Sequence, residues 1–371
     1  MASPRFSRGF SLVEIMVGVV ISIVATIAIF QTFAVSERQK RTVTGASDAQ
    51  INGAIALYMM ERDIRMAGWG MEGSIFANCN TIYAYNGGAG TATDNALAPV
   101  VITDGGTAGP DAIALQYYDD PANRNFRFAT TTLRETMPQS SSILKVSSIY
   151  GCANIDVNGD GVVNNQDIPR AIVQQGGNCT LMDITNVNSS ALTMQHNPGE
   201  GDNPSASYQN ANAWPAYSQG ATLQCFAKNY RKTYSVLAEQ LRLENRPSTG
   251  AIQTADIAPE IVDLQAQYGV AAAGSQQVTA WVDATGSWAS PMTAANIRRI
   301  KAVRVAIVAR SAQYEKPTTG STCDATSAAV AAAWSDWATF NTGTYPADWQ
   351  CYRYRVFEAV IPLRNVIWAN S

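Results

Sequence analysis

The chain has 371 residues, of which 46% are hydrophobic and only 15% are charged, and its formal net charge is −3. This length is sufficient to bury a substantial hydrophobic core. No block of basic residues is dense enough to follow a phosphate backbone, which argues against nucleic acid as the main partner. A charge content well below the usual quarter of residues suits a protein at a membrane, or among its own copies, better than a cytosolic enzyme.

The first predicted element is a long uncharged run. Residues 15–35, IMVGVVISIVATIAIFQTFAV, are 21 positions without a charge. Because about 20 apolar helical residues cross the hydrocarbon core of a bilayer, the run predicts a membrane helix. It follows a short basic leader, MASPRFSRG, whereas an ordinary signal peptide has its cleavage site after the apolar stretch. Glu14 stands at the start of the run, where a carboxylate is costly and points to a function.

Residues 9–14, GFSLVE, resemble the class III signal of type IV pilins and type II secretion pseudopilins. The resemblance implies that a prepilin peptidase cleaves after Gly9, that Phe10 becomes an N-methylated N-terminus, and that Glu14 follows as the fifth mature residue. A carboxylate on a neighbouring subunit could then neutralise the new α-amine and fix the stagger between subunits. The alternative for Glu14 is a carboxylate that only snorkels to the membrane interface. Basic residues flank the run on both sides, so the resemblance, and not the positive-inside rule, places the head outside the cytoplasm.

Beyond the run, residues 36–66 contain no proline. Ile51, Ile55, Tyr58 and Met59 recur there at helical spacing, which predicts that an amphipathic second half continues the same helix into the head.

Glycines mark the weak points and the end of this helix. Gly45 and Gly53 would be soft points within it. Gly68 and Gly70 in the sequence AGWG would end it. The expected organisation is therefore a cleaved leader over residues 1–9, a helix over residues 10–70 with its membrane half at 10–35, and a head over residues 71–371.

The head reads as short β-like runs between clusters of Gly, Asn, Asp, Pro and Ser. The pilin resemblance implies an α+β fold, in which the long helix packs on an antiparallel β-sheet head with long loops. The runs cover residues 112–118, 143–148, 181–185, 192–195, 302–310 and 352–363, and residues 232–243 and 261–268 fit the same pattern. The sequence leaves open whether the head has one lobe or two.

Residues 156–167, DVNGDGVVNNQD, closely resemble the calcium loop of dockerin modules. Calcium needs six or more hard oxygen ligands, and donors at alternate positions let a short loop wrap around it. The donors would be Asp156, Asn158, Asp160, the carbonyl of Val162, Asn164 and Asp167, with Gly161 at the sharp turn. Pro169 departs from the pattern because it would shorten the exiting helix. We expect a structural Ca²⁺ here, and the alternative is a β-turn loop without metal.

Six cysteines, none in a CxxC pair, predict disulfides in an oxidising compartment, with six buried free thiols as the alternative. Six cysteines allow 15 pairings. Proximity along the chain suggests Cys323–Cys351 and Cys152–Cys179, which leaves Cys79 for Cys225.

Four segments, at the end of the helix and in the head, resemble the PilW family of minor type IV pilins. They are RMAGWG at 65–70, EIVDLQAQYGV at 260–270, IKAVRVAIVARS at 300–311 and YRYRVFEAVIPLRN at 352–365. Family analogy also makes residues 323–351 a disulfide-closed loop near the C-terminus, whose aromatic residues fill a local core more readily than they form an adhesive patch.

Catalytic machinery is not expected. The single histidine, His196, reads as a turn residue, and a single histidine gives little material for a catalytic triad. The sequence has no P-loop, dinucleotide fingerprint or HExxH motif. Adjacent carboxylates such as Asp119 and Asp120 are usually a solvated turn.

By these resemblances the chain is identified as a minor pilin of the PilW type. It would span the inner membrane once with its head in the periplasm, and later reside in the pilus at the cell surface. Its implied partners are other minor and major pilins, the prepilin peptidase and the inner-membrane assembly machinery, and its implied role is to prime or cap the pilus in motility, adhesion or DNA uptake. The alternatives are a type II secretion pseudopilin related to GspJ, a calcium-dependent pilus-tip adhesin, and a membrane-anchored periplasmic protein that keeps its leader and never polymerises.

Overall fold

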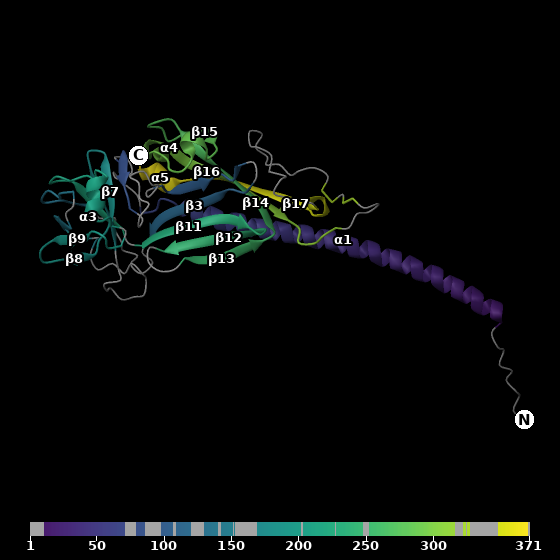
Figure 1. Cartoon of the computed structure of the whole chain (residues 1–371). Coiled ribbons are helices and arrows are strands. Elements are labelled where there is room, and N and C mark those ends of the chain that lie inside the picture. The colour runs from purple at the N-terminus through teal and green to yellow at the C-terminus, as the bar shows by residue number, and fades with distance from the viewer. Residues whose placement is uncertain are drawn as a thin grey trace, which may run out of the picture.

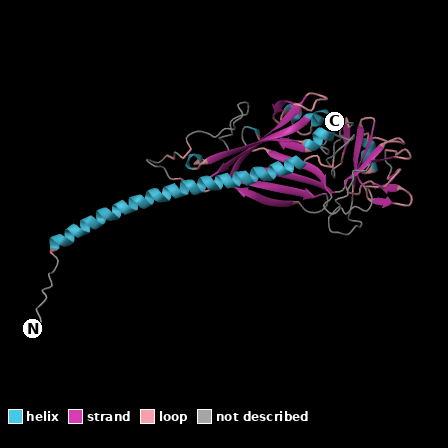
Figure 2. Ribbon diagram, turned by 180° about the vertical axis from the view of Figure 1, so that it is seen from behind, coloured by secondary structure: helices cyan, strands magenta, loops and turns pink. Residues whose placement is uncertain are grey.

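In the computed structural model, a long helix carries a β-rich head at its C-terminal end (Figures 1 and 2). The structure describes residues 11–70, 79–85, 98–106, 109–119, 130–139, 142–150, 152, 169–201, 203–226, 228–247, 252–315, 322–323, 325–326 and 348–369. Helix α1 spans Leu12–Met66, 55 residues, which at the helical rise is about 80 Å. Its first half leaves the head entirely and is long and apolar enough to cross a membrane. The expected helix is confirmed, including its end before Gly68 and Gly70, which both have positive φ.

The part of the head around α1, which we call the body, contains two antiparallel sheets. The first has the order β13 (Gln253–Pro259), β12 (Gln240–Pro247), β11 (Lys228–Leu237), β3 (Ala112–Asp119), β2 (Val100–Thr103). The second has the order β15 (Val278–Val282), β14 (Ile261–Ala271), β16 (Ile300–Arg310), β17 (Tyr354–Pro362). The second half of α1 packs mainly on β16 and β17 and also reaches β13 and β3, so helix and sheets share one apolar core.

Short elements complete the body. They are the 3₁₀ turns η2 (Gly286–Trp288) and η4 (Trp349–Cys351), and the helices α4 (Ala294–Arg299) and α5 (Arg364–Ala369). Helix α5 packs against the C-terminal end of α1, close to the place where the body meets the rest of the head (Figure 1).

A second group of strands, the distal lobe, lies at the end of the head away from the free half of α1 (Figure 1). One sheet has the order β1 (Thr81–Tyr83), β7 (Asn178–Asp183), β6 (Arg170–Gln175), β10 (Thr222–Phe226), β4 (Thr130–Thr132). The other has the order β5 (Ile143–Lys145), β9 (Thr193–Gln195), β8 (Asn186–Asn188), and α3 (Ala206–Ala211) lies beside them. The lobe has apolar clusters of its own, separate from the core of the body.

The distal lobe is an insertion between two paired strands of the body. Asp119 at the end of β3 pairs in register with Lys228 at the start of β11. The chain therefore leaves the body at the end of one strand and returns at the start of its neighbour. Among the described strands, β1, which pairs in parallel with β7, is the one that reaches the lobe from elsewhere in the sequence. The head thus has two lobes, a point that the sequence left open.

Most strand predictions are confirmed, and one is wrong. Residues 232–243 fit a single strand by pattern, but they contain the β11–β12 hairpin, whose turn is Ala238–Glu239. Both turn residues have positive φ, 50° and 60°. Tight hairpin turns of this kind usually carry Gly, Asn or Asp, so no residue type at these two positions signalled a turn.

Candidate functional site

The start of α1 presents one carboxylate to the outside. Glu14 lies in the first helical turn and is exposed. A negative charge there is compatible with the positive end of the helix dipole. Within the described residues, Glu14 has no ion-pair partner, and the predicted processing residues Gly9 and Phe10 lie outside them. This carboxylate is therefore available to a group from another chain.

The rest of the free half of α1 is an apolar rod with its polar groups satisfied internally. The hydroxyls of Ser22, Thr26 and Thr32 donate to the carbonyls four residues earlier, at 2.8, 2.6 and 2.9 Å. Gly18, Ser22 and Thr26 follow one another at four-residue spacing along a shallow hollow of the helix surface. Small residues at this spacing allow a second helix to approach closely inside a membrane.

The half of α1 inside the head is buried along a face of small residues, Gly45, Ala49, Gly53 and Ala56. A Cβ on Gly53 would lie 2.1 Å from the ring of Phe357 in β17, and one on Gly45 would lie 3.0 Å from Cβ of Ser311. The sequence suggested that these glycines soften the helix. Their structural role is instead to let the helix axis lie close to the sheet.

Three large apolar residues of this half point away from the head, whereas Met60 and Ile64 are buried in the core. Ile51, Ile55 and Tyr58 are 53%, 46% and 66% exposed, and we call them the outward stripe. Their helical spacing is as predicted, but they do not contribute to the core of their own chain. An exposed apolar row along the helix marks a surface for another protein.

A buried carboxylate ties α1 to the first sheet. Asp63 is 3% exposed and accepts hydrogen bonds from the hydroxyl of Tyr234 at 2.6 Å and the ammonium of Lys232 at 2.8 Å. Burial, and then the bond to Asp63, raise the pKa of Tyr234. Burial alone would lower the pKa of Lys232, but the interactions with Asp63 and Tyr117 together outweigh it and the net pKa is raised. The sequence analysis missed Asp63, although a lone Asp on the apolar face of a helix is a signal that could have found it.

The C-terminal end of α1 is closed by a residue from the other end of the chain. The side-chain amide of Asn365 faces the carbonyls of Arg65, Met66 and Ala67 at 3.2–3.4 Å. These are carbonyls that the helix itself leaves without partners. Asn365 therefore ties the C-terminal end of α1 to helix α5.

The end of the body nearest the free half of α1 is held by Arg310. Its guanidinium bonds to Glu260 at 2.7 Å and Glu239 at 2.9 Å, and it lies 4.4 Å from the centre of the Tyr352 ring. The side chain is only 8% exposed, so this network joins β16 to the hairpin turn of the other sheet. Sequence reasoning had no signal for it, because its members lie far apart along the chain.

The three disulfides are Cys79–Cys179, Cys152–Cys225 and Cys323–Cys351. The last confirms the prediction, whereas the proposed pairs Cys152–Cys179 and Cys79–Cys225 are wrong. The parallel pairing of β1 with β7 brings Cys79 beside Cys179 across 100 positions. Proximity along the chain could not foresee a pairing set by the sheet.

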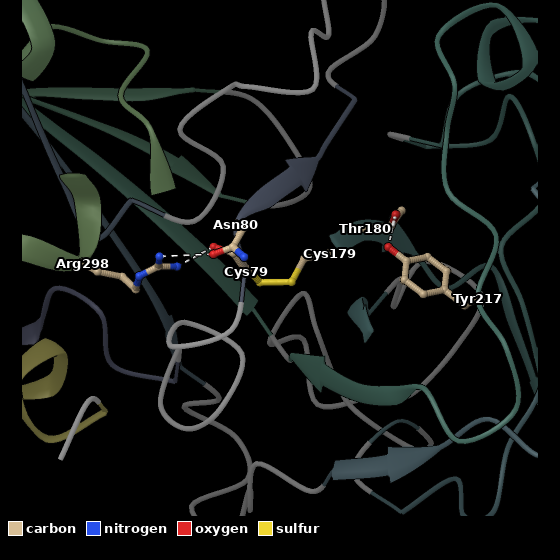
Figure 3. The surroundings of a disulfide bond; sticks show 6 residues. All are labelled: Cys79, Asn80, Cys179, Thr180, Tyr217 and Arg298. Carbon is tan, nitrogen blue, oxygen red and sulfur yellow. Dashed lines mark hydrogen bonds between the residues drawn. A yellow bond between two sulfur atoms is a disulfide. The ribbon is translucent and has the colours of Figure 1, made fainter. Parts of the chain in front are cut away.

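Figure 3 shows that the chain beside the first disulfide also contacts the body. Arg298 of α4 donates to the carbonyl of Cys79 at 2.6 Å and to the side-chain oxygen of Asn80 at 3.3 Å (Figure 3). Inside the lobe, Thr180 and Tyr217 share a hydrogen bond of 2.7 Å next to the disulfide. The body is thus hydrogen-bonded to the lobe at the point where the disulfide links β1 to β7.

The predicted calcium donors Asp156, Asn158, Asp160, Val162, Asn164 and Asp167 lie outside the described residues. The chain on either side is fixed. Cys152 is bonded to Cys225 in β10, and β6 begins at Arg170.

Two family models match the chain. Residues 226–365 match type IV pilus-assembly protein W, called PilW, and residues 4–30 match the prokaryotic N-terminal methylation motif. No curated protein and no solved structure matches. The PilW match begins at the end of β10 and continues through β11 to the start of α5, so nearly all of it lies in the body and very little in the distal lobe.

Proposed function

Since the chain is a PilW-type minor pilin of a type IV pilus, held in the inner membrane by one helix before it is assembled, we propose that Glu14 carries its entry into the filament. Both matches are to pilin families, which points to a structural and non-enzymatic protein. The observation that carries the proposal is the position of Glu14, a lone exposed acid at the start of an apolar rod.

The proposed chemistry is an ion pair between subunits. Cleavage after Gly9 would expose the α-amine of Phe10, and the carboxylate of Glu14 on a neighbouring subunit would neutralise it. In hydrocarbon an unpaired charge is costly, so a subunit with the wrong axial offset would leave both groups unpaired. Breaking one side of a buried pair typically costs about 3–5 kcal/mol, enough to select one stagger.

The outward stripe would be the second contact with a neighbour. Ile51, Ile55 and Tyr58 are exposed on the side of α1 opposite the face that its own head covers. A neighbouring subunit whose membrane half packs on α1 would meet this stripe as the helices continue into the heads. We expect it to be buried in the filament and exposed in the stored subunit.

The shape of the head supports a place at the filament end. The distal lobe extends the head away from the membrane helix, and the PilW match scarcely touches it (Figure 1). A subunit in a complex with other minor pilins that primes or caps the pilus has room for such an extension, whereas repeated subunits along the shaft are confined by their neighbours. Through this position the protein would act in motility, adhesion or DNA uptake.

The test of the Glu14 pair is the variant Glu14→Ala beside Glu14→Gln. Both variants should be cleaved and inserted in the membrane, because neither changes Gly9 or the apolar run. Both should be absent from sheared pili and from complexes with other minor pilins, and the cells should carry at least tenfold fewer pili. Cross-linking, carried out on both membranes and sheared pili of each strain, would measure these differences. Normal assembly of either variant would contradict the proposed ion pair.

For the loop at residues 156–167 we propose a structural Ca²⁺. Its oxygen donors suit a hard cation, and its flanks are fixed by Cys152–Cys225 and by β6. Millimolar calcium should raise the melting temperature of the wild type by several degrees through mass action. It should not do so for the double variant Asp156→Ala, Asp160→Ala. The control Asp119→Ala, Asp120→Ala removes the same two charges outside the loop and should respond like the wild type. An equal change of melting temperature in all three proteins would contradict the calcium proposal.

A further inference from the structure

A polar cleft of about 520 Å³ lies where α1 leaves the head. Its helix wall is Glu37, Lys40, Arg41 and Thr44, and its head wall is Gln313 and Tyr314 from the segment after β16. Two cations and one acid line it, which gives a net charge of 2 − 1 = +1. Its size is within the range of small-ligand sites.

The position of the cleft along α1 is that of the lipid headgroups. Lys40 lies five residues beyond Val35, the end of the uncharged run, which at the helical rise is about 8 Å. The headgroup layer of one leaflet is about 5–8 Å thick outside the hydrocarbon core. In the membrane-stored subunit the cleft therefore opens at the depth of the phosphates of the outer leaflet.

The donors in the cleft are free to bind an anion. Lys40 has no ion-pair partner in the part of the chain that the structure describes. Arg41 bonds to Glu37 through Nε alone, at 3.2 Å, and this contact orients the guanidinium while leaving its terminal N–H groups unbound to that acid. The carboxylate of Glu37 and the side-chain oxygens of Thr44 and Gln313 remain as acceptors for hydroxyl groups.

The head wall of the cleft is preformed. The Tyr314 ring stacks edge-on against Tyr352 with 5.8 Å between ring centres, and its hydroxyl lies 3.4 Å from Sγ of Cys323, a disulfide sulfur to which it can only donate. Next to it, Glu315 pairs with Arg353 at 2.6 Å. Tyr314 is still 42% exposed, and tyrosine is enriched at the membrane interface. A rigid wall lowers the entropy cost of holding a headgroup.

We propose that this cleft binds the headgroup of an anionic, hydroxyl-bearing phospholipid such as phosphatidylglycerol while the subunit is stored in the membrane. Lys40 and Arg41 would hold the phosphate, and Glu37, Thr44 and Gln313 would receive the hydroxyls of the headgroup. The proposal rests on the membrane-stored state of the protein, and it is independent of the Glu14 pair.

The test is native mass spectrometry of the full-length chain in detergent micelles, titrated with phosphatidylglycerol. Lys40→Gln should weaken binding about fivefold and the Lys40→Gln, Arg41→Gln double variant about 25-fold, at about fivefold for each cation. Arg38→Gln is the matched control for Lys40→Gln, since it removes the same charge from nearly the same height on the helix, lies about 200° from Lys40 around the helix axis and does not line the cleft. It should bind like the wild type.

Three outcomes would overturn the assignment. Equal losses in Lys40→Gln and Arg38→Gln would mean a diffuse charge attraction without a site. Equal affinity for phosphatidylethanolamine, which carries no net charge, would remove the role of the cleft's charge. Saturation by inorganic phosphate at the same concentration would make the ligand a free anion. The Glu14→Ala variant should retain wild-type lipid binding, which separates this proposal from the assembly mechanism.

Discussion

The body and the distal lobe achieve stability by different means. The body has strands of up to 11 residues, a helix packed along two sheets and one large apolar core. The lobe has strands of three to six residues in this structure and smaller clusters, but it contains two of the three disulfides. The difference teaches that the helix-bearing part is held by packing, whereas the inserted part depends on covalent links, as small domains with limited cores often do.

The largest expected effect is a break in the packing of the body. Gly53→Leu should destabilise the protein by about 3–5 kcal/mol, because even a Cβ would collide with Phe357. Thermal unfolding of the full chain in detergent measures this, with Ala54→Leu on the exposed side of the helix as control. The smaller substitution Gly53→Ala, combined with Phe357→Leu, should recover part of the stability that Gly53→Leu loses. If Gly53→Leu melts like Ala54→Leu, the close approach of helix and sheet is wrong.

The next effect is confined to the lobe. Removal of Cys152–Cys225 through Cys152→Ala with Cys225→Ala should cost about 2–4 kcal/mol, since the bond closes a segment with a sequence separation of 73. Hydrogen exchange should accelerate in β6 and β10 and remain unchanged in β14 and β16. The corresponding double variant at Cys323 and Cys351, with a separation of 28, should leave the lobe unaffected. Faster exchange throughout the head would contradict independent stabilisation.

The smallest effect is an opposite response of the two regions to pH. Burial raises the pKa of Asp111 in the body to about 7 and that of Asp263 to about 6. Burial lowers the pKa of His196 in the lobe to about 4. Carboxyl groups whose pKa is raised by folding stabilise the fold at low pH, and this contribution is lost as the pH rises from about 4 through 7. The histidine stabilises above about pH 6.5 and loses its contribution as the pH falls towards 4.

Local exchange rates between pH 4 and 7.5 can test this contrast, with about 1–3 kcal/mol expected for each region. His196→Gln should remove the acid sensitivity of the lobe, and Asp111→Asn should reduce the response of the body to the part that Asp263 contributes. The histidine variant is needed because burial also raises the pKa of Asp183 in the lobe, against the effect of Arg170. Identical pH profiles for wild type and both variants would rule out these groups as the cause.

The sequence predicted the elements whose signals are local. The uncharged run, the glycines after Met66 and the β-like runs each depend on neighbouring residues, and all but the run at 232–243 appear in the structure as predicted. What it could not predict depends on contacts across the chain. The Cys79–Cys179 pair follows from a parallel strand pairing, and Asn365 closes a helix some 300 positions away.

The outward stripe is an intermediate case. Periodicity identified Ile51, Ile55 and Tyr58 as one face of a helix, but it could not state which protein that face would contact. The face that packs on the sheet carries glycine and alanine, which hydrophobicity patterns rank low. In a protein built to assemble, apolar periodicity can mark the partner's side as readily as the core.

The pairing of Asp119 with Lys228 has an evolutionary consequence. Adjacent strands lie about 4.8 Å apart, so a short turn could bridge the two ends if the intervening segment were lost. The same gap could equally receive a different module, provided that its own termini meet. The body with its helix and the inserted distal lobe can therefore diverge at separate rates. We expect related subunits to carry different inserted lobes on a shared body.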